Sequence, residues 1–436
     1  MSKTSRLIVL CSAVLCSQYL CAQSRTMGIE EMFRLADENS KSIQTYRTGK
    51  EVADENLKAA KAQRLPDISA SLSGSYWGNG KLWDRDFSNA TKIDMPHWGN
   101  NFALEAQQVV YAGGAISSGI ELAELEKQLA EMDWQKNRQD IRFLLVGHYL
   151  NLYKLHNQIE VLHKNLELTD QLIANMQARL EEGTALENDI TRYELQRETL
   201  RLQLAKVEDA CKIANHQLVI TLHLPEGTVV QPDTTLNDSR IQTLSEANWQ
   251  ELAAQNNLNL QQAETGIKVN RQRVKMERSE RLPKISLVAA EHLDGPITIE
   301  VPVLDNNFNY WYVGVGVKYN ISSLFKNNRK LKAARLNVRK AQETYELAQE
   351  QTNHAVQESY VNFLTSFTDL RTQQKSVELA DQNYSVTSNR YQNDLALLTD
   401  MLDASNMKLS ADLGLVSARI NVIYNYYKMK YVTHTL

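Results

Sequence analysis

Asp400 and Asp403 are the residues for which a chemical role is easiest to argue. They lie three positions apart in a segment with a helical pattern. Side chains at i and i+3 project from one face of a helix, so both carboxylates can face the same cation. A structural role competes for Asp400, because an acidic residue beside Thr399 also suits the capped, positive first turn of a helix. Both roles remain open for Asp400, and they can coexist.

Signatures of catalysis are absent from the sequence. It has no His-Glu-x-x-His motif, no phosphate-binding glycine loop and no Cys pair for zinc. The glycines between Val313 and Val317 have the wrong spacing for a dinucleotide site and fit a strand better. His148 lies on a coiled-coil seam, where a polar residue more often sets register than binds a ligand. The sequence therefore predicts a protein that is not an enzyme and that holds no metal or cofactor.

Composition indicates a folded, helix-rich chain, and the first residues indicate that it is exported. It is 23% charged and 43% hydrophobic, with 7 Pro in 436 residues, and its net charge of −4 favours no nucleic-acid partner. Residues 1–22 have the basic start, apolar stretch and final Ala22 of a signal peptide. Lipid attachment at Cys21 is the alternative, although Leu20 precedes it where lipoprotein signals prefer a small residue. No other segment approaches the roughly 20 apolar residues of a spanning helix, so any bilayer crossing must be β.

A repeated hexapeptide indicates an internal duplication. Arg-Leu-Pro-Asp-Ile-Ser at 64–69 returns as Arg-Leu-Pro-Lys-Ile-Ser at 281–286. Each copy lies between a helical pattern and a strand, and is followed by a second strand, a long heptad segment, a break and a return helix. We place the first structural repeat at residues 23–240 and the second at residues 241–436.

Each repeat is predicted to contain a long helical hairpin. Apolar residues recur every three or four positions from Ile141 to Leu180 and form a coiled-coil seam. A second seam, from Val356 to Tyr391, contains more polar and more aromatic residues. A helix over 117–182 would extend roughly 100 Å, which no compact domain holds. Two shorter helices stacked end to end would match the length of each long helix. The remaining predicted helices cover 28–65, 186–222, 244–282, 325–392 and 399–431, with hairpin tips near 180–190 and 391–403.

Four strand-like segments alternate apolar and polar residues in the manner of a membrane barrel wall. They form one strand pair within 66–111 and another within 283–321. Four strands cannot close a barrel, since the smallest outer-membrane barrels have about eight, so several chains must share one wall. A strand pair that caps a soluble bundle is the alternative. Aromatic residues collect at the strand ends, as at membrane interfaces: Tyr76, Trp77, Tyr310, Trp311 and Tyr312.

In combination these motifs resemble the TolC family of outer-membrane efflux proteins, over essentially all of the mature chain. The resemblance rests on the repeated hexapeptide, on Val110 to Gly114 and Leu324 to Asn328 after the second strands, and on an Asp after the turn at each tip. It implies a mainly α fold with membrane β, in which a homotrimer builds a twelve-stranded barrel and a periplasmic helical tunnel. Each chain would give four strands. The implied location is the outer membrane of a Gram-negative bacterium, in contact with its lipid.

The resemblance also implies roles at the hairpin tips. Asp400 and Asp403 fall on the family's two gate aspartates, and three copies would form two acidic rings that favour cations. For Asp403 the gate is favoured over a structural role. Asn188, Asp189 and Tyr391 fall on latch positions that tie the hairpins together.

Two residues depart from the family pattern at the second tip. Asp394 stands where the family usually has Gly, and Ala396 stands where one member has a latch arginine. Arg390 and Arg192 are the candidate replacements. The tip turns are the implied adaptor-docking surface: Gly183, Thr184, Asp394 and Leu395.

The predicted function is passive conduction through an exit duct of a tripartite efflux pump or a type I secretion system. The implied partners are a periplasmic adaptor protein and an inner-membrane pump, which supply direction and energy. The competing hypothesis is an exported coiled-coil scaffold, or a periplasmic adaptor, that binds partners without making a pore. Adaptors usually place one hairpin in a β-rich chain, whereas this sequence has two long hairpins.

Overall fold

The computed structural model describes residues 24–233, 241, 243–300, 303–393 and 395–436. The predicted signal peptide and Asp394 lie outside these ranges, and so does the boundary between the predicted repeats. The chain divides into two compact units. The first contains residues up to Thr48, Met132–Gln261 and Leu347–Leu436, and the second contains Gly49–Glu131 and Gln262–Glu346. Among the described residues, no helix combines the length and the apolar character that crossing a bilayer requires.

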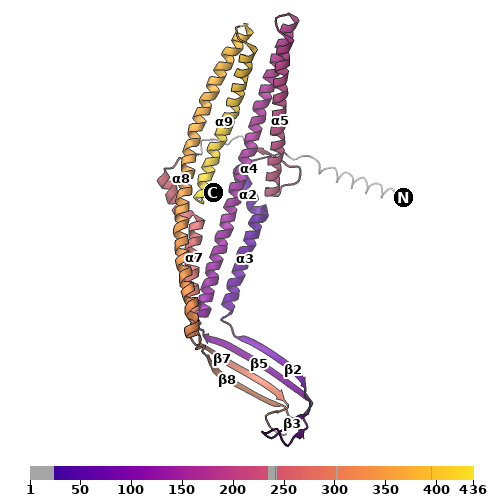
Figure 1. Ribbon diagram of the computed structural model, residues 1–436, viewed down its shortest axis with the longest axis vertical. Helices are drawn as coiled ribbons and strands as arrows, with labels where there is room; N and C mark the ends of the chain where they lie inside the picture. Colours follow the sequence, from indigo (N-terminus) through magenta and orange to yellow (C-terminus); the bar gives the residue numbers. More distant parts are fainter. Residues whose placement is uncertain (1–23, 234–240, 242, 301–302, 394) are drawn as a thin grey trace, which may run out of the picture. The chain divides into compact units, whose positions relative to one another are not determined.

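The first unit consists mainly of two antiparallel helical hairpins. Helix α4 pairs with α5, and α8 pairs with α9 (Figure 1). A short parallel pair, β1 with β6, accompanies them. The elements that lie wholly or mostly in this unit are β1 (Ser24–Met27), α2 (Ile29–Asn39), α4 (Ala115–Glu181), α5 (Glu187–Leu222), β6 (Val229–Pro232), α6 (Glu246–Asn256), α8 (Ser323–Gln392) and α9 (Leu398–Val432).

The second unit contains a four-stranded antiparallel sheet in the order β2-β5-β7-β8 (Figure 1). The two predicted strand pairs meet in its centre, where β5 of the first repeat bonds to β7 of the second. A small hairpin, β3 with β4, lies in the connection between β2 and β5, where no strand was predicted. The elements of this unit are α3 (Lys41–Ala62), β2 (Asp67–Tyr76), β3 (Gly80–Leu82), β4 (Thr91–Ile93), β5 (Trp98–Tyr111), α7 (Leu258–Ser279), β7 (Lys284–Gly295) and β8 (Phe308–Lys318).

The two shorter helical columns are each broken at one residue. Ser40 separates α2 from α3, and Asn257 separates α6 from α7, both with extended backbone. Asn257 caps the new helix, because its side-chain oxygen accepts hydrogen bonds from the N–H groups of Asn259 (2.9 Å) and Leu260 (3.2 Å). Both breaks are buried, with Ser40 4% and Asn257 3% exposed. The single helices predicted over 28–65 and 244–282 are therefore two helices each.

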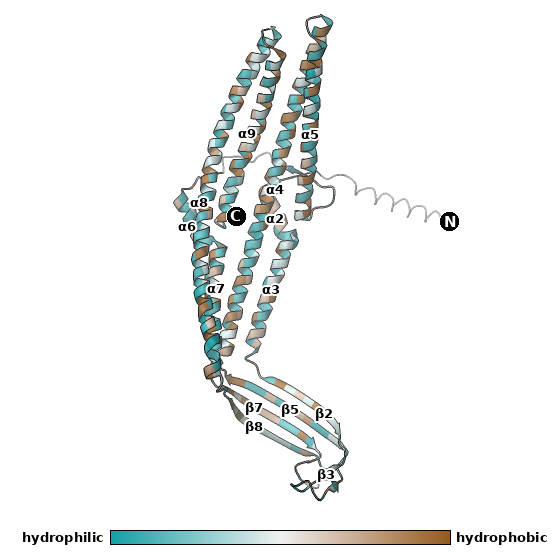
Figure 2. Cartoon of the chain, viewed as in Figure 1, coloured by the Kyte–Doolittle hydropathy of each residue, from teal (hydrophilic) through white to brown (hydrophobic). Residues whose placement is uncertain are grey.

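The predicted seams form the hydrophobic core of the first unit. Leu145, Leu152 and Leu162 are at most 1% exposed along α4, and Val356 and Phe363 are fully buried along α8. His148 is half-buried on the same seam, and burial lowers the pKa of its imidazole, although a hydrogen bond with Gln217 acts in the opposite direction. Figure 2 shows hydrophobic and hydrophilic residues interleaved along these helices, as a narrow seam requires.

The two faces of the sheet differ in character. Strand register puts Ile68, Leu72, Val313 and Val315 on one face, and all four are at least 67% exposed. The opposite face carries the serines of β2 with Asn101, Gln107 and Glu105. Among the described residues of the second unit, these apolar side chains stay exposed, so the apolar face of the sheet is uncovered there.

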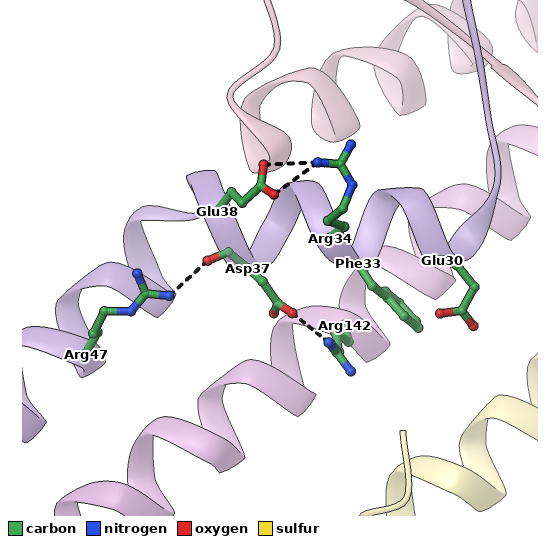
Figure 3. A pocket seen from close by; sticks show the side chains of 7 residues that line it. All are labelled: Glu30, Phe33, Arg34, Asp37, Glu38, Arg47 and Arg142. Carbon is green, nitrogen blue, oxygen red and sulfur yellow. Dashed lines mark hydrogen bonds and ion pairs between the residues drawn. The ribbon is translucent and has the colours of Figure 1, made fainter.

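An ion cluster ties α2 to α4 in the first unit. The carboxylate of Asp37 accepts hydrogen bonds from Nε (2.8 Å) and a terminal nitrogen (2.6 Å) of Arg138, and from Arg142 (2.6 Å). Burial alone would raise the pKa of Asp37, but these hydrogen bonds and positive charges outweigh it and lower the pKa. Figure 3 shows Asp37 and Arg142 beside Phe33, whose ring lies 5.1 Å from the Arg142 guanidinium carbon. The open pocket around them is lined almost wholly by charged residues, most of which already bond other groups of the protein, so we assign it a structural role.

Replacing Asp37 by Asn is expected to destabilise the first unit by about 1.5–3 kcal/mol at pH 7, the range for hydrogen bonds to charged groups. Because the folded pKa is depressed, this stabilisation exists above the ordinary Asp pKa of about 4 and is lost as pH falls below it. Thermal unfolding of native and D37N protein in detergent at pH 7 and pH 3 measures both effects. The control is Glu38→Gln, which removes the exposed Glu38–Arg34 pair and is expected to cost less than about 1 kcal/mol. A D37N deficit of equal size at both pH values would contradict the electrostatic explanation.

Candidate gate and docking site at the hairpin tips

The second tip combines both roles considered for Asp400. Helix α8 ends at Gln392 and α9 begins at Leu398. Asp400 Oδ2 accepts a hydrogen bond from the Leu397 N–H (3.1 Å), so it caps the first turn of α9. Leu397 has no side-chain acceptor of its own, which leaves this carboxylate to satisfy the helix start. The cap uses one oxygen of Asp400 and leaves the side chain exposed.

Asp400 and Asp403 line one open pocket with Arg390, as their i, i+3 spacing predicts. The pocket holds about 290 Å³ and is bounded by polar side chains, including Asn383 and Thr387. Arg390 donates to the carbonyl oxygen of Leu395 (3.1 Å), which fixes its guanidinium at the turn. Arg390, one of the two predicted replacement residues, thus lies beside the candidate gate carboxylates.

The first tip repeats the same cap. Asp189 Oδ2 accepts from the Leu186 N–H at 3.4 Å, matching Asp400 and Leu397 in the second tip. Gly183 has φ of 73°, and Thr184 bonds back to the Arg179 carbonyl through its N–H (2.8 Å) and its hydroxyl (3.1 Å). This is the left-handed glycine turn that ends a helix.

The latch candidates are brought together only in part. Asp189, Tyr391 and Arg192 line one pocket of about 350 Å³ between the two hairpin tips. Asn188 is exposed on the first turn of α5 and is not part of this lining. The hydroxyl of Tyr391 donates to the Met176 sulfur at 2.9 Å.

Sequence reasoning missed Arg179 and Met176. The guanidinium carbon of Arg179 lies 5.8 Å from the centre of the Tyr391 ring, a cation–π distance. The available signal was the repeat itself, because Arg179 precedes the first tip as Arg390 precedes the second. A buried hydrophobic cluster also joins the two hairpins next to these residues. Within this cluster, burial together with the nearby Tyr391 raises the pKa of Tyr193. The buried members are Ile173, Met176, Ile190, Tyr193, Leu398 and Met401.

Comparison with known proteins identifies the family to which this chain belongs. The family model described as outer membrane efflux protein matches residues 33–222 and 249–425, which include the first hairpin, the second hairpin as far as residue 425, and all four sheet strands. The chain belongs to the outer membrane efflux protein family. Outer membrane efflux protein BepC of Brucella suis is 19% identical over 397 residues, covering 90% of this chain and 82% of BepC.

Solved structures of an outer membrane protein and of a transmembrane channel share the fold. The crystal structure of VceC from Vibrio cholerae matches with a TM-score of 0.77 at 16% identity, over 93% of this chain and 95% of VceC. A structure of CusC matches with a TM-score of 0.81 at 16% identity, over 93% of this chain and 91% of CusC. The predicted TolC-like fold, with its internal duplication, is confirmed.

Membership in the outer membrane efflux protein family establishes the protein's class and place. It is an efflux channel of the outer membrane, with its helical part in the periplasm. The family consists of channel proteins, and the scaffold and adaptor alternatives gain no support from it.

Proposed function

We propose that three copies of this efflux protein close a single pore. The observation that carries the proposal is the uncovered sheet: β2 and β8 are its edge strands, and each has one side without a partner among the described strands. Open edges and an exposed apolar face are unstable in water, and both are satisfied when neighbouring sheets join into a wall surrounded by lipid. Three sheets of four strands exceed the minimum of about eight strands that a membrane barrel needs.

The periplasmic end of this pore is governed by Asp400 and Asp403. Three copies would place six carboxylates around one axis, and such rings attract cations and repel anions. The pocket that both residues share with Arg390 supports this role, because it keeps the carboxylates exposed and close together. The cap formed by Asp400 fixes their orientation. Tyr391, Asp189 and Asn188 act as the latch between the hairpins, with Arg179 stacked on Tyr391 in place of the missing arginine.

The tip turns form the surface that docks a periplasmic adaptor, through which the channel connects to an inner-membrane pump. Apolar side chains at both turns support this role, since Leu186, Leu395 and Leu397 are 66–70% exposed. A cluster of exposed leucines is a favourable site for a helical partner. Gly183 and Thr184 shape the first turn, and Leu395 belongs to the second. Asp394, which lies outside the described residues, is proposed with it from the sequence alone.

Conductance in planar bilayers tests the pore and the gate together. Native protein is compared with Asp400→Asn, Asp403→Asn, which removes charge but keeps an oxygen that can cap α9. At about 0.1 M salt, where the Debye length is about 10 Å, the double variant is expected to lose cation preference on the order of ten-fold. The matched control is Glu181→Gln, Glu187→Gln, which removes two exposed charges near the first tip and is expected to leave selectivity unchanged.

The outcomes separate the two parts of the proposal. Channels with unchanged selectivity in the double variant would contradict the gate and retain the pore. A folded protein that remains a water-soluble monomer, and never forms heat-sensitive trimers in detergent, would contradict the pore itself.

A further inference from the structure

A row of stacked aromatic rings crosses one end of the polar face of the sheet. The ring centres of Phe308 and Tyr310 are 5.2 Å apart, those of Tyr310 and His292 are 5.1 Å apart, and those of His292 and Tyr312 are 6.1 Å apart. The rings are nearly parallel, with interplanar angles of 25°, 12° and 10°. We name these four residues the aromatic row.

Strand register assigns the aromatic row to the polar face. His292 lies opposite Tyr310 and Ala103, and Ala103 lies opposite Ser71 on β2. Tyr310 and Tyr312 therefore do not share the apolar face with Trp311, although the strand-end position suggested membrane-interface aromatics for all three. The correction follows from the two-residue period of a strand, which separates Trp311 from both tyrosines.

The duplication sharpens the contrast between the two halves of this face. Counted from the shared hexapeptide, Ser75 of the first repeat corresponds to His292 of the second, and Ser73 corresponds to Ala290. The first repeat thus presents the Ser75 hydroxyl where the second presents the His292 ring. Phe308 is 53% exposed, Tyr310 36% and Tyr312 47%, so the rings are open to solvent within this chain.

Acidic groups accompany the rings. Tyr310 donates its hydroxyl to Asp294 Oδ2 at 3.3 Å, and Asn101 donates to the other oxygen of the same carboxylate. Glu105 is exposed on the same face, two positions along β5 from Ala103. Carboxylates beside exposed ring faces favour a ligand that is both flat and positively charged, because stacking and cation–π attraction act on it together.

We propose that the aromatic row is a transit site for planar aromatic cations inside the pore. The inference rests on the proposed pore, since the polar face lines its interior only when the apolar face meets lipid. Three chains would then place three such rows around the channel wall, alternating with the serine rows of β2. A flat cation lies against the exposed parts of the Tyr310 and Tyr312 rings near Asp294, while a strongly hydrated metal cation gains only the charge term.

The test is block of single-channel current by proflavine, a planar aromatic cation, with Mg²⁺ as a cation that keeps its hydration shell and so does not contact ring faces. Tyr310→Leu, Tyr312→Leu is expected to raise the half-blocking concentration of proflavine about ten-fold or more, as expected for loss of stacking surfaces. The same variant is expected to leave Mg²⁺ block within about two-fold, since no carboxylate is removed. The matched control, Tyr310→Phe, Tyr312→Phe, keeps the rings and is expected to keep proflavine block.

The aromatic row can be rejected as a binding site while the proposed pore is retained. Open channels in which proflavine blocks native and leucine variants equally would overturn the aromatic row as a site. Equal block by proflavine and Mg²⁺ in the native channel would also overturn it, because charge alone would then account for binding. Absence of any current would instead count against the pore, which the bilayer recording of native protein establishes first.

Discussion

Replacement of Gly113 by Val is expected to prevent the second unit from folding and therefore to abolish trimers. Gly113 links β5 to α4 with φ of +63°, a conformation that a β-branched residue avoids. A Cβ at this position would lie 2.8 Å from Leu282 Cβ and 2.9 Å from the Ser279 carbonyl oxygen. Backbone strain and overpacking together cost roughly 2–6 kcal/mol, a large share of the roughly 5–15 kcal/mol that stabilises a typical protein.

Two neighbouring glycines serve as controls for this substitution. Gly114 also has positive φ, at +86°, but a Cβ there would meet nothing within 4 Å. Gly114→Ala is therefore expected to cost only the strain, about 1–3 kcal/mol. Gly119 lies inside α4 with open space around it, and Gly119→Ala is expected to be neutral or mildly stabilising. The yield of heat-sensitive trimers ranks the three variants, and native yield from Gly113→Val would contradict the steric argument.

Truncation of Phe363 to Ala is expected to cost about 3–5 kcal/mol, the usual range for a buried Phe. Phe363 is fully buried in the seam of α8, and its ring packs edge-on against Phe367 at 5.0 Å. It joins Trp249 of α6 and Met429 of α9 in one core cluster. Losing this ring leaves a cavity where three helices meet.

Leu364 provides the matched comparison on the same helix. It is 46% exposed, so Leu364→Ala removes similar apolar volume outside the core and is expected to cost less than about 1 kcal/mol. Thermal unfolding in detergent, followed by helical circular dichroism, measures both variants. Similar melting temperatures for F363A and L364A would show that the aromatic seam of α8 does not carry the stability assigned to it.

The hairpins and the sheet were predictable because their signals are periodic. The seam from Leu145 to Met176 and the alternation from Trp311 to Val317 each repeat over many residues, so single exceptions do not hide them. The breaks at Ser40 and Asn257 were not predictable. Each depends on one residue with extended backbone inside a pattern that remains helical on both sides.

The tip site shows the same limit at the level of side chains. The spacing of Asp400 and Asp403 predicted a shared face, and one pocket contains both. The approach of Arg179 to Tyr391 joins two hairpins that are far apart in the sequence, and no local pattern encodes such a pairing. The aromatic row likewise required the register between β7 and β8, which single-strand periodicity leaves undetermined.

The open edges of β2 and β8 create a hazard before assembly. A newly exported chain whose sheet has formed presents unpaired backbone groups at both edges and a broad apolar face, the features that recruit strands of other polypeptides into aggregates. The strand edges and the apolar face that would join subunits in the channel thus make an unassembled subunit a substrate for holdase chaperones. Cells that express this protein faster than its subunits meet are expected to accumulate misassembled chains, even though every subunit has a native sequence.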